Sequence, residues 1–167
     1  MEHDPNFDIR YSEIKDFSYV KEWICEPQIS KWFPMSTVKE VEDVLACWMG
    51  FCRLKSSLTA TIDGIPCGVV TLFLMPYKKV CHHCIFKLVV NPKYHRRGIG
   101  SSLVKNAKHL AKDYFRLERL QIEVMEHNPL ISLLKKQDFQ EVMSQSKYFK
   151  IADTYQGRVL MEAKLVK

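Results

Sequence analysis

A strand-like run, a basic loop with two glycines and a helix-like run follow one another near the middle of this chain, and together they constrain its fold most strongly. The apolar run covers residues 85–90, the pair Asn91-Pro92 interrupts it, and the loop is His95-Arg96-Arg97-Gly98-Ile99-Gly100. Glycines let the backbone approach a ligand closely, and the first amides of a helix have no partner within that helix. Arginines add a positive charge that matches phosphate oxygens. The segment therefore predicts a pyrophosphate-binding loop at the start of a helix.

Two common phosphate-binding motifs do not fit this loop. The chain contains no G-x-x-x-x-G-K-(S or T) motif, which excludes a nucleotide-binding P-loop. The dinucleotide motif G-x-G-x-x-G needs a third glycine after Gly98 and Gly100, but Leu103 occupies that position. The pyrophosphate is therefore expected to belong to a different kind of ligand.

The loop instead resembles the (Gln or Arg)-x-x-Gly-x-(Gly or Ala) signature of the GNAT superfamily of N-acetyltransferases, which binds the pyrophosphate of acetyl-coenzyme A. Residues 88–100 as a whole are similar to that family's V-x-P-x-x-x-x-x-G-x-G core. His95 stands where the family usually has Gln or Arg, so we expect weaker or pH-sensitive binding. The resemblance implies that these residues bind the coenzyme: His95, Arg96, Arg97, Gly98, Ile99, Gly100, Ser101 and Ser102.

Periodicity and turn residues predict a mixed α+β order of elements. Thr37 and Glu40 form a capping box at the start of a helix, and Asp63-Gly64 predicts a tight hairpin turn. The helix after the loop places Leu103, Ala107, Leu110, Ala111 and Tyr114 on one apolar stripe. Strands are expected at 7–11, 58–62, 65–74, 80–90, 120–125, 139–149 and 158–166, and helices at 17–24, 37–51, from about 101, and 129–137. No repeat or long linker divides the chain, so residues 1–167 are expected to form one domain.

The resemblance implies a GNAT-like fold with a central, mostly antiparallel sheet of six to seven strands and about four flanking helices. In that fold the fourth and fifth strands form a parallel pair that splays apart. Here these strands are residues 80–90 and 120–125. The family uses the unpaired backbone of the splayed strand to hold the pantetheine arm and the acetyl carbonyl. The resemblance thereby assigns this contact to Leu88, Val89 and Val90.

Glu123 is the candidate catalytic residue. It interrupts the apolar run 120–125, and a buried charge is unfavourable without a partner or a cavity. A carboxylate can remove the proton from an attacking amine, directly or through water. Residues 122–129 also resemble the family's L-x-V-x-x-x-N motif, in which the matching glutamate often acts as the base in protein N-terminal acetyltransferases. The alternative is a glutamate on a solvent-facing side of the strand.

Asn128 has two interpretations. It resembles the asparagine that hydrogen-bonds the pantetheine arm, and it also suits the start of a helix as a capping residue. We interpret its neighbours Glu126 and His127 as surface residues.

One departure from the family pattern concerns the general acid. The family continues as A-x-x-L-Y-x-x-x-G-F, and its tyrosine can protonate the coenzyme thiolate. Here Leu134 and Lys135 occupy the region of the family's Leu-Tyr pair, and neither side chain carries a phenol. Asp138 replaces the glycine. Water, or one of Ser132, Tyr148 and Tyr155, is a possible substitute. The departure also leaves open a catalytically degenerate protein that only binds the coenzyme.

The early helical region carries Trp32, Phe33 and Met35 in a loop with proline breaks. In the usual layout of the superfamily this region overhangs the acceptor site. The alternative is that these side chains only close the core.

Composition restricts the class of protein further. The chain has 167 residues, a formal net charge of +6 and 47% hydrophobic residues, which is ordinary for a globular domain. No apolar run approaches the roughly 20 residues of a membrane span, and the polar start at residues 1–5 does not resemble a signal peptide. A basic nucleic-acid-binding domain is less favoured because typical RNA- and DNA-binding motifs are missing. We expect a cytoplasmic protein.

The cysteines do not indicate a disulfide framework or a metal site. Six cysteines lie mostly inside apolar segments, which favours buried free thiols. Cys81-His82-His83-Cys84 lies at an expected strand start, where alternate side chains face opposite ways. Four ligands in a row are therefore not expected to converge on a metal ion.

The sequence thus predicts an acetyltransferase, an acyltransferase that uses acetyl-CoA as co-substrate and needs no metal. The acceptor is expected to be a primary amine on a protein N-terminus, a lysine or a small molecule, and to attack the thioester directly in a ternary complex. The alternative is a catalytically degenerate coenzyme-binding sensor or docking module. A monomer or a homodimer is expected.

Overall fold

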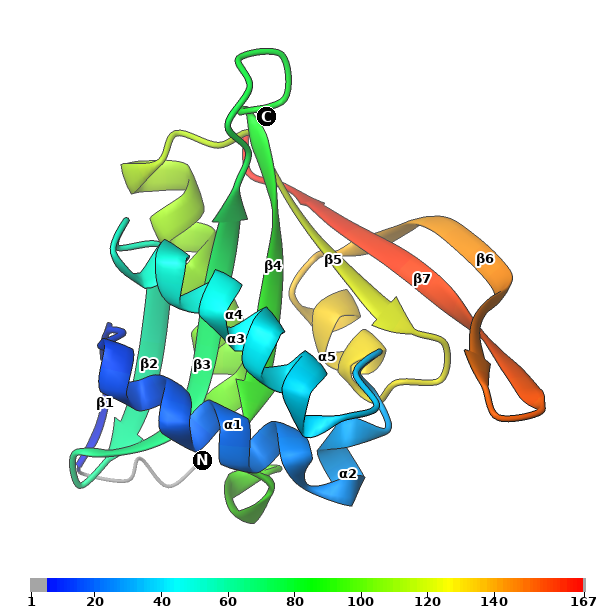
Figure 1. Ribbon diagram of the computed structural model, residues 1–167. Coiled ribbons are helices and arrows are strands. Elements are labelled where there is room, and N and C mark those ends of the chain that lie inside the picture. The colour runs from blue at the N-terminus through cyan, green and yellow to red at the C-terminus, as the bar shows by residue number, and fades with distance from the viewer. Residues whose placement is uncertain (1–5, 167) are drawn as a thin grey trace.

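The computed structural model describes residues 6–166; the N-terminal segment 1–5, where we expect no signal peptide, and residue 167 lie outside the described part. Its centre is a seven-stranded sheet with the order β1-β2-β3-β4-β5-β7-β6 (Figure 1). The strands are β1 (Phe7–Tyr11), β2 (Ser57–Ile62), β3 (Ile65–Leu74), β4 (His83–Val90), β5 (Arg119–Met125), β6 (Gln140–Ile151) and β7 (Thr154–Lys164). The helices are α1 (Phe17–Cys25), α2 (Pro27–Ser30), α3 (Val38–Cys52), α4 (Ile99–His109) and α5 (Leu130–Lys136).

This architecture confirms the expected mixed α+β fold. Every neighbouring pair of strands is antiparallel except β4 and β5, which are parallel. The described residues contain five α-helices, one more than the expected four, because Pro27 starts the four-residue α2 between α1 and α3.

Helices cover both faces of the sheet. Figure 1 shows α1 and α3 in front of the strands β2 to β4 and α4 behind them. Val69 and Val89 pack with α1 and α3 in one core cluster, whereas Val70 and Leu88 pack with α4 and α5 in the other. Because successive residues of a strand face opposite sides, both sides of β3 and β4 are apolar.

The capping box and the hairpin turn that the sequence predicts are both present in the structure. Thr37 Oγ1 accepts a hydrogen bond from the Glu40 amide at 3.2 Å, which completes the capping box of α3. Asp63 and Gly64 have φ angles of 51° and 76°, the conformation that a two-residue hairpin turn between β2 and β3 requires.

Two expected elements differ in detail. The strand expected from residue 80 begins at His83, because residues 77–82 form turns after Pro76. Tyr114 does not belong to the apolar stripe of α4, since its side chain is 59% exposed. The helix changes to a π-helical turn over Leu110–Tyr114, and the wider turn rotates Tyr114 away from the sheet.

The expectation of mostly buried cysteines was wrong. All six are free, but only Cys67 and Cys84 are buried, while Cys25, Cys47 and Cys81 are exposed. An apolar sequence neighbourhood does not determine which face of a helix a residue occupies, and Cys47 lies on the outer side of α3. Burial raises the pKa of the Cys84 thiol to about 12, which does not suit a nucleophile.

A buried carboxylate fastens the start of α1 to the sheet. Asp16 is fully buried and accepts two hydrogen bonds from Arg10, at 2.8 and 2.9 Å, one from the Glu13 amide at 2.8 Å and one from Thr59 at 2.9 Å. Burial raises the pKa of Asp16, but these hydrogen bonds and the Arg10 charge outweigh it and hold the pKa below its ordinary value. The network therefore stabilises the charged form of Asp16 in the folded chain.

We expect Asp16→Ala to lower the free energy of unfolding by about 3 kcal/mol, because it leaves Arg10 without its buried partner. The pKa of Asp16 is lower in the folded than in the unfolded chain. Its contribution is therefore complete above the unfolded-state pKa and is lost as the pH falls through the folded-state value. Urea unfolding at neutral and acidic pH should show the difference from the unsubstituted protein shrink in acid. Asp43→Ala, which removes an exposed pair with Lys39, is the control and should change little.

Candidate active site

The sheet opens between β4 and β5. These strands pair only at His83–Arg119, Cys84–Leu120 and Ile85–Gln121. Beyond that point β4 remains paired with β3 up to Val90, and β5 remains paired with β7 up to Met125. The two halves of the sheet therefore diverge, as Figure 1 shows, and leave backbone groups without a neighbouring strand.

The glycine loop at the end of β4 presents free amides. Gly98 precedes α4 with φ 82°, a left-handed conformation that favours glycine, and no side chain caps the helix. Within residues 6–166, the amides of Gly98, Ile99, Gly100 and Ser101 donate no hydrogen bond, whereas the Ser102 amide already bonds the Gly98 carbonyl at 3.0 Å. The loop has the free donors that a pyrophosphate needs.

The basic side chains of the loop have different positions. His95 Nε2 lies 2.9 Å from the Val90 carbonyl oxygen, so this side chain ties the loop to the end of β4. Arg96 has φ 64° and lines the cavity described below. Arg97 lies outside that cavity, with its guanidinium 5.4 Å from the centre of the Tyr94 ring.

A cavity of about 650 Å³ runs along the opening, from the glycine loop to α2 and the end of β5. Arg97 and Ser102 do not line it. The sequence-predicted site residues that do line it are Leu88, Val89, Val90, His95, Arg96, Gly98, Ile99, Gly100, Ser101, Glu123 and Asn128. The structure thus brings together residues from the loop, β4, β5 and the start of α5. The volume is within the range of small-ligand and cofactor sites.

Glu123 lies on the polar face of β5, toward the cavity. Its Oε2 accepts a hydrogen bond from Arg158 Nη1 of β7 at 2.5 Å, and the two side chains are 27% and 22% exposed. Arg158 also stacks on the Tyr148 ring, 3.8 Å from its centre, which holds the pair in place. The second carboxylate oxygen of Glu123 has no hydrogen-bond partner among the described residues, so it remains available to a ligand.

Glu126 and Asn128, which follow Glu123, both accept hydrogen bonds from backbone amides. Asn128 Oδ1 accepts a hydrogen bond from the Leu130 amide at 2.9 Å, so the side chain supports the start of α5 while it lines the cavity. Glu126 is not simply a surface residue, because its carboxylate accepts a hydrogen bond from the Gly157 amide of β7 at 2.6 Å. His127 is exposed, as expected.

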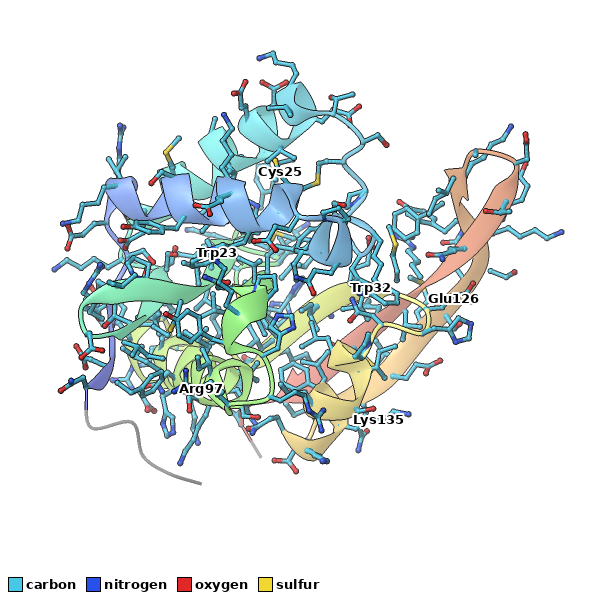
Figure 2. All side chains as sticks on the ribbon, turned by 90° about the horizontal axis from the view of Figure 1, so that it is seen from below. Trp23, Cys25, Trp32, Arg97, Glu126 and Lys135 are labelled. Carbon is cyan, nitrogen blue, oxygen red and sulfur yellow. The ribbon has the colours of Figure 1, made fainter. Side chains whose placement is uncertain are left out.

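The helix α5 supplies no phenol to the cavity. Leu134 is fully buried in the core, and Figure 2 shows Lys135 on the side of α5 that faces away from α1 and α2. Of the expected substitutes, Ser132 lines the cavity, whereas Tyr148 and Tyr155 do not. Of these three hydroxyl groups, the structure therefore places only that of Ser132 in the lining of the cavity.

The segment around α2 closes the cavity on the side of α1 and also contributes to the core. Trp32 and Phe33 line the cavity, and Figure 2 shows Trp32 on the side of α2 that faces α5. Phe33 and Met35 pack against the core cluster of α1 and α3. A second cavity of about 420 Å³ adjoins here, between this segment and the β6–β7 hairpin.

Several residues of the cavity were not identified from the sequence. These residues include Tyr94, Lys136 and Lys87, and Lys87 is the most important for the charge of the site. Lys87 interrupts the apolar run 84–90, the same signal that pointed to Glu123 in β5. Arg158 could not be found in this way, because its pairing depends on the register of β5 with β7.

Residues 6–166 contain no group of three or more His, Cys, Asp or Glu side chains placed to hold a metal ion. Within the same residues no helix is both long and apolar enough to cross a bilayer.

A splayed parallel strand pair, a loop with free amides and a cavity that joins them form a site suited to a long ligand with a pyrophosphate at one end. The family model described as the acetyltransferase (GNAT) family matches residues 18–139. The chain therefore belongs to the GNAT family of acetyltransferases.

Individual relatives are similar over nearly the whole chain. The L-amino acid N-acetyltransferase AaaT of Escherichia coli (strain K12) is 24% identical over 144 residues, which cover 84% of this chain and 86% of the relative. The protein yncA of Salmonella typhimurium, solved with its cofactor acetyl-CoA, superposes with a TM-score of 0.83 at 14% identity and covers 97% of this chain and 95% of its own. The ribosomal-protein-alanine N-acetyltransferase of Brucella melitensis gives a TM-score of 0.81 at 16% identity, with coverages of 94% and 99%. The structural likenesses show the same fold.

Proposed function

We propose that this protein transfers the acetyl group of acetyl-CoA to a primary amine by direct attack in a ternary complex. The observation that carries the proposal is the continuous cavity between the free amides at Gly98–Gly100 and the carboxylate of Glu123. A pyrophosphate at the loop and a pantetheine arm along the open edge of β4 would bring the thioester toward Glu123. The acetyltransferase family of the chain supports this use of the cavity.

The residues have distinct roles in this proposal. The loop amides and Arg96 hold the pyrophosphate, the backbone of Leu88, Val89 and Val90 holds the pantetheine arm, and Asn128 contacts the same arm. Glu123 accepts the proton of the attacking amine, because this residue lines the cavity and its second oxygen has no hydrogen-bond partner among the described residues. The amine nitrogen attacks the thioester carbonyl, the carbon–sulfur bond breaks, and the sulfur leaves as a thiolate that water or Ser132 can protonate.

The acceptors named for the relatives differ, since one is an L-amino acid and another a ribosomal-protein alanine. The names of the relatives therefore do not determine whether the acceptor is a protein N-terminus, a lysine or a small-molecule amine. A cytoplasmic location is part of the proposal and agrees with six free cysteines.

Two measurements on the same preparation test the proposal. Isothermal titration calorimetry should show acetyl-CoA binding, and a thiol-detecting reagent should show release of coenzyme A that depends on an added amine or peptide. Absence of acetyl-CoA binding would overturn the assignment of the loop.

A coenzyme-binding module without transfer activity is the second candidate. One observation favours it: Leu134 is buried and Lys135 points away from the cavity, so α5 supplies no phenol. Acetyl-CoA binding without thiol release against any amine of a broad panel would establish this second candidate.

A further inference from the structure

Lys87 and Glu123 lie at equivalent positions on the two diverging strands. The last paired residues of the two parallel strands are Ile85 and Gln121, and Lys87 and Glu123 each lie two residues further along. Two steps along a strand return the side chain to the same face. Lys87 and Glu123 therefore lie on the same face of the diverging strands, and both line the cavity.

Glu123 has an oppositely charged hydrogen-bond partner, whereas Lys87 has none among the described residues. Glu123 is bound by Arg158. Lys87 is half-buried, and no described residue accepts a hydrogen bond from its ammonium group or forms a close ion pair with it. Burial lowers the pKa of Lys87, and the Glu123 charge opposes this shift only in part. A cation in this environment is stabilised by an anion that enters the cavity.

The acceptor end of the site is positively charged overall. The lining of the two adjoining cavities near α2 and β6 includes Lys31, Lys87 and Lys150. Glu123 is the single acidic residue that lines either cavity in the described part of the chain, and Arg158 already neutralises it. A polycationic acceptor such as a polyamine would meet uncompensated repulsion here, whereas an acceptor with a negative charge would be attracted.

We infer, on the basis of the proposed N-acetyltransferase function, that the acceptor is an amine that carries a carboxylate close to its nitrogen, as a free α-amino acid does, and that Lys87 binds this carboxylate. The amine and the carboxylate of an amino acid lie close together, and Lys87 and Glu123 lie at equivalent positions on the same face of the two strands that line the cavity. The carboxylate then lies against Lys87 while the amine faces Glu123. The amine nitrogen forms the new bond to the acetyl carbon, its proton passes to Glu123, and the coenzyme sulfur departs.

The test compares L-amino acids with their carboxamides, which keep the amine and the side chain but lack the negative charge. The unsubstituted protein should acetylate the acids in preference to the amides. Lys87→Met should reduce kcat/KM for the acids by about 100-fold, mainly through KM, and should leave kcat/KM for the amides nearly unchanged. Lys87→Arg should restore much of the preference, because arginine keeps the positive charge.

Lys164→Met is the matched control, since Lys164 is an exposed lysine on the same sheet, outside both cavities. Calorimetry with acetyl-CoA confirms that each variant is folded. Equal loss of turnover for acids and amides in both Lys87→Met and Lys87→Arg would mean that Lys87 takes the proton, and the inference would be wrong. Equal use of acids and amides by the unsubstituted protein, or a preference for polyamines, would also overturn it. Acetyl-CoA binding with no acceptor acetylated at all would instead contradict the proposed transfer function.

Discussion

Replacement of Gly98 by aspartate is expected to weaken acetyl-CoA binding by at least about 100-fold. Gly98 has φ 82° and lies directly before the free amides of α4, so the new carboxylate would occupy the region proposed for the pyrophosphate. The carboxylate and the pyrophosphate are both negative and would repel each other strongly in a partly enclosed site. Isothermal titration calorimetry measures the change directly, and a thermal melt shows whether the domain remains folded.

The hairpin turn between β2 and β3 offers a matched control. Gly64 also has a positive φ, 76°, and a side chain added there would meet no atom within 4 Å. Gly64→Asp therefore imposes the same change of backbone preference and charge away from the cavity, and acetyl-CoA affinity should stay within about twofold. Gly98→Ala separates strain from charge, and it should weaken binding less than Gly98→Asp. If a folded Gly98→Asp protein binds acetyl-CoA as tightly as the Gly64→Asp protein, the loop does not hold the pyrophosphate.

Those parts of the fold that depend on short-range signals were predictable. The Thr37 capping box and the Asp63-Gly64 turn each involve residues within four positions of one another, and both formed as expected. Features that depend on packing between elements were harder to predict from the sequence. The π-helical turn that exposes Tyr114, and the exposed positions of Cys25 and Cys47, follow from helix rotation against the sheet, which the residue types alone do not determine.

The site divides in the same way. A contiguous motif marked the glycine loop, and the structure places its backbone at the cavity with free amides. The charged residues at the other end belong to three strands. The register of β5 with β7 brings Arg158 to Glu123, and the register of β4 with β5 places Lys87 on the same face of the sheet as Glu123. A charge inside an apolar strand marks Lys87 and Glu123 individually. That both line one cavity, with no other acidic residue in the described lining, could be known only from the fold.

Glu123→Gln is expected to lower kcat by about 100-fold or more and to leave acetyl-CoA affinity within about threefold. Glutamine keeps the size of the side chain and an oxygen that can still accept a hydrogen bond from Arg158, but it cannot take a proton from the amine. The loop that is proposed to bind the pyrophosphate lies at the opposite end of the cavity and should be unaffected. Steady-state kinetics with the best acceptor, together with calorimetry of acetyl-CoA, separate the two quantities.

Glu162→Gln is the control that isolates the chemistry from the loss of a carboxylate–arginine pair. Glu162 accepts hydrogen bonds from Arg119 at 2.9 Å and Gln121 at 2.7 Å, on the same face of β5 and β7 as Glu123, but it does not line the cavity. Its replacement removes a comparable ion pair and should affect stability far more than kcat. A Glu123→Gln protein that turns over as fast as the Glu162→Gln protein would show that the proton leaves the amine by another route, with bulk water or Lys87 as the acceptors to examine next.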